Sequence, residues 1–218
     1  MSYSGIGQQA EDNARLLIRL MKEHGALDLG ATANFFEVSH EWCCPSCHRT
    51  KAEQARLDKN GNLLAAIHNH HDHMGDGAYD CIPSIPHGSL EWRDRLGYDS
   101  LRGNFRRFPD TLICNDCNVV EGAAKKVCGA PEKFSFTPFE ISTFIIVENN
   151  RAHRIDADRL LSTWGNVKPS LEAYRGELRH INSFNKNPDG FEQVGGAALR
   201  VLKDVRQKMK QREEDGAA

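Results

Sequence analysis

Hydrophobic and polar positions repeat with helical spacing near the beginning of the chain. Between residues 8 and 24, apolar side chains recur every three or four positions, at Ala14, Leu17, Ile18 and Met21. Gly25 follows directly and is a suitable stop signal for a helix. The pattern predicts an amphipathic N-terminal helix that packs on the rest of the protein or on a second copy of the chain.

The middle of the chain has short apolar runs in place of helical periodicity. Leu63 to Ile67 and Thr111 to Ile113 are typical of brief strands. The segment between them, residues 75–109, contains glycine, proline and arginine and predicts a long loop. Loops of that length in compact domains are usually functional or disordered.

The chain becomes helical again after Thr137. The sequence Thr137-Pro138-Phe139-Glu140 combines a capping box with proline at the first helical position. Apolar spacing predicts three more helices, over residues 156–164, 170–183 and 191–212. We therefore expect an α+β protein with flanking N-terminal and C-terminal helices, divided into segments 1–40, 41–131 and 132–218.

Composition narrows the class of protein. The chain has 218 residues, of which 39% are hydrophobic and 27% charged, as in ordinary soluble domains. No apolar run reaches membrane-spanning length and the N-terminus has no signal-peptide pattern, which predicts a cytoplasmic protein without membrane contacts. The formal net charge of −2 argues against nonspecific coating of nucleic acid, but it is compatible with a local basic groove.

Cysteine spacing predicts a metal centre. The chain has seven cysteines, an odd number that favours reduced thiols over a disulfide framework. Four of them form two Cys-x-x-Cys pairs, Cys44 with Cys47 and Cys114 with Cys117. Two such pairs complete a tetrahedral shell of four thiolates, which predicts a structural Zn²⁺.

Other interpretations of the cysteines are weaker. A redox motif needs one pair and leaves the second unexplained, and a zinc deaminase requires His-x-Glu before Pro-Cys-x-x-Cys. Here His40 and Glu41 are adjacent, and Pro45 lies inside the first pair. Cys43 competes with Cys44 as a ligand, whereas we expect the two remaining cysteines to be small apolar residues. These two are Cys81 and Cys128.

The stretch His68-Asn69-His70-His71-Asp72-His73 is the richest in candidate chemistry. Imidazoles bind divalent cations and accept protons from water, which is the chemistry that phosphodiester hydrolysis needs. The alternatives are solvent-facing histidines or a second structural metal. After the second cysteine pair, Asn118 and Glu121 share one face of a helix if that helix begins at the pair, and their oxygens suit Mg²⁺ or Mn²⁺.

Taken together, these motifs resemble the ββα-metal (HNH) endonuclease superfamily. The similarity is to its zinc-bound branch, represented by phage recombination endonuclease VII, and it covers residues 42–126. A D-H-D-H stretch of that branch corresponds to His70-His71-Asp72-His73, and Cys-Asn-x-x-Glu-Gly corresponds to residues 117–122. The resemblance implies a zinc-stapled ββα-metal core and hydrolysis of DNA.

The resemblance also implies roles for individual residues. His71 would be the general base that activates water, and His70 and Asn118 would hold the catalytic Mg²⁺ or Mn²⁺. Glu121 would bind the catalytic cation or orient the groups around it, and His73 would contact phosphate. The chain departs from the family pattern in having His70 where that branch has aspartate. A shifted register therefore stays open, with Asp72 as ligand and His73 as base.

Partners follow from the same resemblance. DNA is the expected substrate and RNA is an alternative. A monomer would nick one strand, whereas a homodimer would cut both strands. A protein partner would direct the enzyme to its target. Antiphage defence is a setting suggested by analogy alone. Arginines and aromatic residues interleaved over 92–108 are candidates for phosphate contact and base stacking. The rival hypotheses are a nucleic-acid-binding module without cleavage and a structural zinc adaptor.

Overall fold

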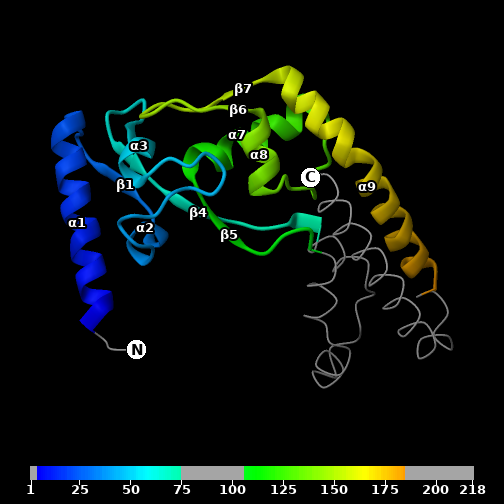
Figure 1. Ribbon diagram of the computed structural model, residues 1–218, viewed down its shortest axis with the longest axis horizontal. Coiled ribbons are helices and arrows are strands. Elements are labelled where there is room, and N and C mark those ends of the chain that lie inside the picture. The colour runs from blue at the N-terminus through cyan, green and yellow to red at the C-terminus, as the bar shows by residue number, and fades with distance from the viewer. Residues whose placement is uncertain (1–3, 75–105, 185–218) are drawn as a thin grey trace, which may run out of the picture. The chain divides into compact units, whose positions relative to one another are not determined.

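The computed structural model describes residues 4–74 and 106–184, which form six helices and seven short strands (Figure 1). The predicted α+β class is confirmed. The chain divides into two compact units, one of residues 1–71 and 108–165 and the other of residues 72–107 and 166–218. The boundaries predicted after residues 40 and 131 divide the chain by type of sequence segment and not by compactness. The division into compact units does not test them, and they stay a prediction.

Some predicted elements lie outside the described residues. These are residues 75–105 of the predicted loop, with Cys81 and most of the interleaved arginines and aromatic residues, and the last helix over 191–212. Arg106, Arg107 and Phe108 are described. Within the described part of the chain, no helix has the length and apolar character needed to cross a bilayer.

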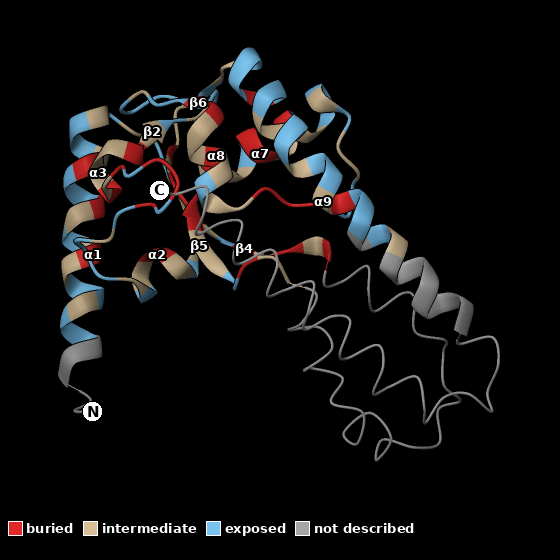
Figure 2. Ribbon diagram, turned by 45° about the vertical axis from the view of Figure 1, so that its right-hand side comes forward, coloured by how far each residue is buried: buried red, intermediate tan, exposed pale blue. Residues whose placement is uncertain are grey.

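Helix α1 (Ser4–His24) ends at Gly25, whose φ of 63° is the left-handed conformation of a helix stop. The predicted helix is therefore confirmed. Of its predicted apolar positions, Leu17 is buried and Met21 packs against the core, whereas Ile18 is 56% exposed. Leu20 and the polar Asn13 are buried as well, and apolar spacing alone does not identify Asn13. Figure 2 shows the buried positions of α1 turned toward α2 and α3.

A three-stranded sheet accompanies α1. Strand β3 (Leu63–Ala65) pairs in parallel with β1 (Leu29–Ala31) and antiparallel with β2 (Arg56–Leu57). Helix α2 (Ala33–Glu37) follows β1. Their apolar side chains form one buried cluster, which comprises Leu17, Leu20, Phe35, Ala55, Leu63, Ala65 and Ile67.

A strand-strand-helix unit follows this sheet. Strand β4 (Ile67–His70) pairs antiparallel with β5 (Thr111–Cys114), which leads directly into α7 (Asn115–Cys128). The predicted strand over 63–67 is thus two strands in two sheets. The chain changes sheets at Ala66, whose carbonyl oxygen accepts a hydrogen bond of 3.0 Å from the backbone amide of Asn115. The helix predicted at the second cysteine pair is confirmed.

Helix α8 (Pro138–Phe144) has the predicted capping box, with both hydrogen bonds between Thr137 and Glu140. It is followed by the hairpin of β6 (Ile145–Ile146) and β7 (Arg154–Ile155). Helix α9 (Ala157–Phe184) is continuous, so the prediction of two helices over 156–164 and 170–183 is wrong. Pro169 lies inside it; an internal proline costs a backbone hydrogen bond but does not have to end a helix.

A second apolar centre holds the segment between α7 and α8. The rings of Phe134 and Phe136 contact each other at 4.8 Å between centroids, and Phe136 contacts Phe144 at 5.1 Å. Trp164, in the first half of α9, packs on Phe134 at 5.3 Å. These edge-to-face contacts fix the backbone of residues 134–136 beside α7.

Lys51 ties α1 and α2 to the short helix α3 (Lys51–Gln54). Its Nζ donates hydrogen bonds to Asn13 Oδ1 at 2.7 Å and to the carbonyl oxygens of Phe35 and Val38 at 2.6 and 2.9 Å. The side chain is buried, and burial lowers its pKa to about 8. Three acceptors satisfy the three ammonium protons, so the charge is accommodated at neutral pH.

Lys51→Met is expected to destabilise the N-terminal part of the protein. The substitution leaves three buried acceptors without this donor, each at a cost of about 1 kcal/mol or more. We expect the melting temperature to fall by at least about 5 °C for a chain of this size. Lys22→Met, at an exposed position of α1, is the control. Equal melting curves for the two variants would contradict this role of Lys51.

Candidate metal centre and catalytic site

Both cysteine pairs meet in one buried group. The Sγ atoms of Cys44 and Cys117 are 3.8 Å apart and those of Cys47 and Cys114 are 3.7 Å apart. All four sulfurs lie within 4.8 Å of one another, and all four residues are buried. The structure therefore brings together the four predicted metal ligands. Two come from the segment before α3, one from the end of β5 and one from the first turn of α7.

This geometry fits a tetrahedral metal ion such as Zn²⁺. Zinc–thiolate bonds of about 2.3 Å place the sulfurs of a tetrahedral shell about 3.8 Å apart, which matches both measured distances. The cluster also needs positive charge, because four adjacent thiols cannot all ionise alone. The hydrogen bond with the Cys114 thiol lowers the pKa of Cys44 to about 7, and the hydrogen bond with Cys114 raises that of Cys117. A divalent cation would favour ionisation of all four.

The backbone supports thiolates in this cluster. The amide of Cys114 donates a hydrogen bond to Cys44 Sγ at 3.3 Å. Cys114 is also the N-cap of α7, so Cys114 and Cys117 both lie at the positive end of the helix dipole. Directly after the first pair, the chain turns through His48, which adopts the left-handed conformation with φ of 58°.

The neighbouring cysteines are not part of the cluster. Cys43 is exposed, and its Sγ lies 3.6 Å from the carbonyl oxygen of Glu41. The alternative in which Cys43 replaces Cys44 as a ligand is therefore not the arrangement observed. Cys128, at the end of α7, is half-buried, and its Sγ lies 3.8 Å from the Lys125 carbonyl oxygen.

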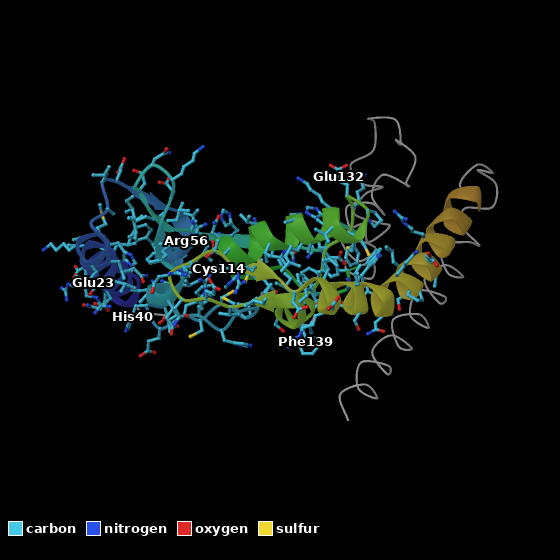
Figure 3. All side chains as sticks on the ribbon, turned by 90° about the horizontal axis from the view of Figure 1, so that it is seen from above. Glu23, His40, Arg56, Cys114, Glu132 and Phe139 are labelled. Atoms are coloured by element: carbon cyan, nitrogen blue, oxygen red, sulfur yellow. The ribbon has the colours of Figure 1, made fainter. Side chains whose placement is uncertain are left out.

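A buried ion-pair network surrounds the cluster, and sequence analysis missed it. Arg49 Nη2 donates to Asp116 Oδ2 at 2.8 Å and lies 3.6 Å from Cys114 Sγ. Arg56 pairs with the other oxygen of Asp116 at 2.9 Å (in Figure 3, sulfur atoms gather beside Cys114, with Arg56 in the same region). Burial opposes the charge of Arg49, but the hydrogen bond with Asp116 and the neighbouring Cys47 and Cys114 together outweigh burial and raise the pKa of Arg49.

Arg49 also joins this centre to the β6–β7 hairpin. Its Nη1 donates to the carbonyl oxygens of Glu148 and Arg151, both at 2.9 Å. Asn150, at the tip of the same hairpin, donates to the carbonyl oxygens of Ala52, within α3, and of Ala55, its C-cap. One signal of this network is visible in the sequence, because Asp116 lies inside the second cysteine pair and Arg49 follows the first.

His70, the predicted cation ligand, is buried at the end of β4. Its ring stacks on Phe108 with 5.0 Å between centroids, and its Nε2 lies 2.7 Å from the carbonyl oxygen of Phe136. Burial lowers the pKa of His70, so the ring is neutral at pH 7. Since a carbonyl oxygen only accepts, Nε2 carries the proton and Nδ1 keeps the lone pair that a cation needs.

The first turn of α7 lies against β4. The side chains of His68 and Asn115 are linked, with 3.1 Å between Nε2 and Oδ1. Asn118 is half-buried and lies three positions before Glu121 on the same helix. His71, the predicted base, directly follows β4 and is half-buried. The unit of β4, β5 and α7 thus contains three of the five predicted catalytic residues, His70, Asn118 and Glu121, and His71 directly follows β4.

Glu121 is buried, and both of its oxygens have partners. Oε1 accepts the backbone amide of Phe136 at 3.2 Å, and Oε2 pairs with Lys125 Nζ at 3.3 Å. Lys125 also donates to the carbonyl oxygen of Phe134 at 3.0 Å. The sequence contains no signal for the role of Phe136, because its contacts to His70 and Glu121 are made by the backbone.

The remaining candidates belong to the second compact unit. Asp72 is buried, and its two oxygens accept the backbone amides of Met74 at 3.0 Å and Arg107 at 2.6 Å. Burial raises the pKa of Asp72 although these hydrogen bonds oppose the shift. Asp72 therefore joins the two chain ends that flank residues 75–105. His73 is half-buried.

Comparisons with protein-family models, curated proteins and solved structures found no match for this chain. The resemblance to the ββα-metal superfamily thus depends on the motif residues alone, and membership of that superfamily stays a prediction.

Cys44→Ser is expected to abolish binding of a metal ion that the wild type carries at one per chain. Removal of one thiolate leaves the tetrahedral shell incomplete. Binding of a structural zinc contributes to the free energy of folding in such centres, so the fold should also lose stability. Cys43→Ser is the matched control and should retain the metal. Elemental analysis of purified proteins measures both. Retention of the metal by Cys44→Ser, or its loss from Cys43→Ser, would contradict the ligand assignment.

Arg49→Met is expected to destabilise the protein by about 3–5 kcal/mol, because the buried Asp116 loses its buried partner. Arg154→Met is the control, since Arg154 forms an exposed pair with Glu148 that is worth about 1 kcal/mol or less. Denaturant unfolding with the metal bound measures both changes. A loss for Arg49→Met no greater than that for Arg154→Met would refute this role.

Proposed function

We propose that this protein is a metal-dependent endonuclease of the ββα-metal type that hydrolyses phosphodiester bonds in DNA. The observation that carries the proposal is the β4–β5–α7 unit. It has a buried, neutral histidine at the end of one strand, a second histidine next to it, and Asn118 in the following helix. The four-cysteine cluster at the start of α7 supports zinc as a structural ion.

The donor set supports a catalytic cation held by His70 and Asn118. The free lone pair of His70 is on Nδ1, and its Nε2–H is bound to a backbone carbonyl, an arrangement typical of metal-binding histidines. The Asn118 amide supplies an oxygen suited to Mg²⁺ or Mn²⁺. When bound, the cation would act as a Lewis acid on the scissile phosphate and on the leaving 3′ oxygen.

The remaining chemistry belongs to His71. It would take a proton from water as the oxygen attacks phosphorus and the bond to the 3′ oxygen breaks. The leaving 3′ oxygen would take a proton from solvent water, which leaves a 5′ phosphate and a 3′ hydroxyl. Both oxygens of Asp72 accept backbone amides, and the shifted register, with Asp72 as ligand and His73 as base, is the alternative that the variants below distinguish.

Incubation with supercoiled plasmid tests the proposal. The wild type should nick or linearise DNA with Mg²⁺ or Mn²⁺ and not with EDTA. His71→Ala should lose at least about 100-fold in rate, the usual contribution of a general base. His40→Ala, at an exposed position before the first cysteine pair, is the control and should cut normally.

Other outcomes have defined meanings. Cutting by His71→Ala together with loss in His73→Ala would show that the register is shifted. A wild type that cuts RNA and not DNA would correct the substrate. A wild type that binds DNA at low salt and cuts neither nucleic acid would replace the nuclease by a binding module.

A further inference from the structure

The backbone of Phe136 connects His70 with Glu121. Its carbonyl oxygen lies 2.7 Å from His70 Nε2, and its amide donates to Glu121 Oε1 at 3.2 Å. One peptide segment, between α7 and α8, therefore contacts both a residue of β4 and a residue of α7 (Figure 1). The aromatic contacts of Phe134 and Phe136 hold this segment in place.

Glu121 is poorly suited to bind a cation directly. Its carboxylate is buried, and one oxygen is used by the Phe136 amide and the other by Lys125. A cation at the second oxygen would have to share it with an ammonium group. Lys125 is fixed in turn by its hydrogen bond to the Phe134 carbonyl oxygen. These contacts make Glu121 an anchor for the 134–136 backbone.

The anchored carbonyl controls which nitrogen of His70 is protonated. The energy difference between the two neutral imidazole tautomers is small, so a single strong hydrogen bond decides between them. The Phe136 carbonyl requires a proton on Nε2, which leaves Nδ1 as the basic nitrogen. If the carbonyl moves, the ring loses this preference.

We propose that Glu121 is a positioning residue that, through the Phe136 peptide, sets the tautomer of His70 and so prepares Nδ1 to bind a divalent cation. The inference rests on the proposed function, because the cation has a catalytic role only if the protein is a nuclease. The tautomer itself is a property of the folded chain and can be measured without any cleavage.

Two-bond nitrogen–proton correlation spectra of ¹⁵N-labelled protein report the tautomer of each histidine, and His70→Gln identifies the His70 signals among the ten histidines. The wild type should show a neutral ring protonated on Nε2. Glu121→Ala should show a mixture of tautomers. It should also bind Mn²⁺, measured from the free-ion EPR signal, roughly 10- to 100-fold more weakly, as is typical when outer contacts of a ligand are lost.

Glu121→Gln separates positioning from direct ligation. Gln keeps an acceptor for the Phe136 amide, so it should keep the wild-type tautomer and most of the Mn²⁺ affinity. Glu132→Ala, exposed in the same connecting segment, is the control and should match the wild type (Figure 3 shows Glu132 at the opposite end of α7 from Cys114). Bound zinc and circular dichroism establish that each variant is folded.

Three results would overturn the inference. The first is a wild-type His70 protonated on Nδ1, which needs no variant. The second is an unchanged tautomer in folded Glu121→Ala. The third is an equal loss of Mn²⁺ affinity in Glu121→Gln and Glu121→Ala, which would make Glu121 a ligand. If Glu121→Ala does not fold, the wild-type spectrum and Glu121→Gln still decide.

Failure of the nuclease hypothesis gives a different pattern. An inactive wild type with the Nε2 tautomer, and a shift in Glu121→Ala, would refute the nuclease and retain the positioning role. An active wild type whose tautomer does not depend on Glu121 would refute the positioning role alone.

Discussion

Four buried thiols meet at the point where β5 becomes α7. Cys44 contacts Cys117, which is 73 positions away in the sequence, and Cys47 contacts Cys114, which is 67 positions away. Closing so long a loop costs conformational entropy, and an ion that fits this cluster would supply the free energy to hold it closed. Because Cys114 ends the strand and Cys117 lies in the first helical turn, the direction of α7 relative to β4 and β5 depends on this cluster. The buried Arg49–Asp116 pair strengthens the same junction.

Farther along α7, a second set of contacts determines the state of His70. The four-cysteine cluster holds the beginning of the helix, and Glu121 with Lys125 holds the backbone of residues 134–136 one to two turns later. His70 contacts that backbone through Nε2. The region that resembles the nuclease family ends at residue 126, yet the contact that orients His70 comes from beyond it. The segment that connects α7 with α8 is therefore part of the candidate site.

Local signals predicted much of this organisation. The two cysteine pairs, the helix that begins at the second pair, and the capping box at Thr137 depend on residues close in sequence, and the structure has all three. Long-range effects were not predictable in the same way. The burial of the polar Asn13 on the inner face of α1 was not predictable, because its partner Lys51 is 38 positions away in the sequence. The continuity of α9 across Pro169 and the role of the Phe136 peptide leave no distinctive pattern in the sequence.

The central claim is that one ion organises the ββα unit and a different ion binds beside His70. Anomalous diffraction from crystals soaked in Mn²⁺, recorded at the zinc and manganese absorption edges, tests it most directly. The account predicts a zinc peak among the sulfurs of Cys44, Cys47, Cys114 and Cys117, and a manganese peak within bonding distance of His70 Nδ1 and Asn118 Oδ1. A manganese peak at Asp72 and His73, or none near His70, would contradict it.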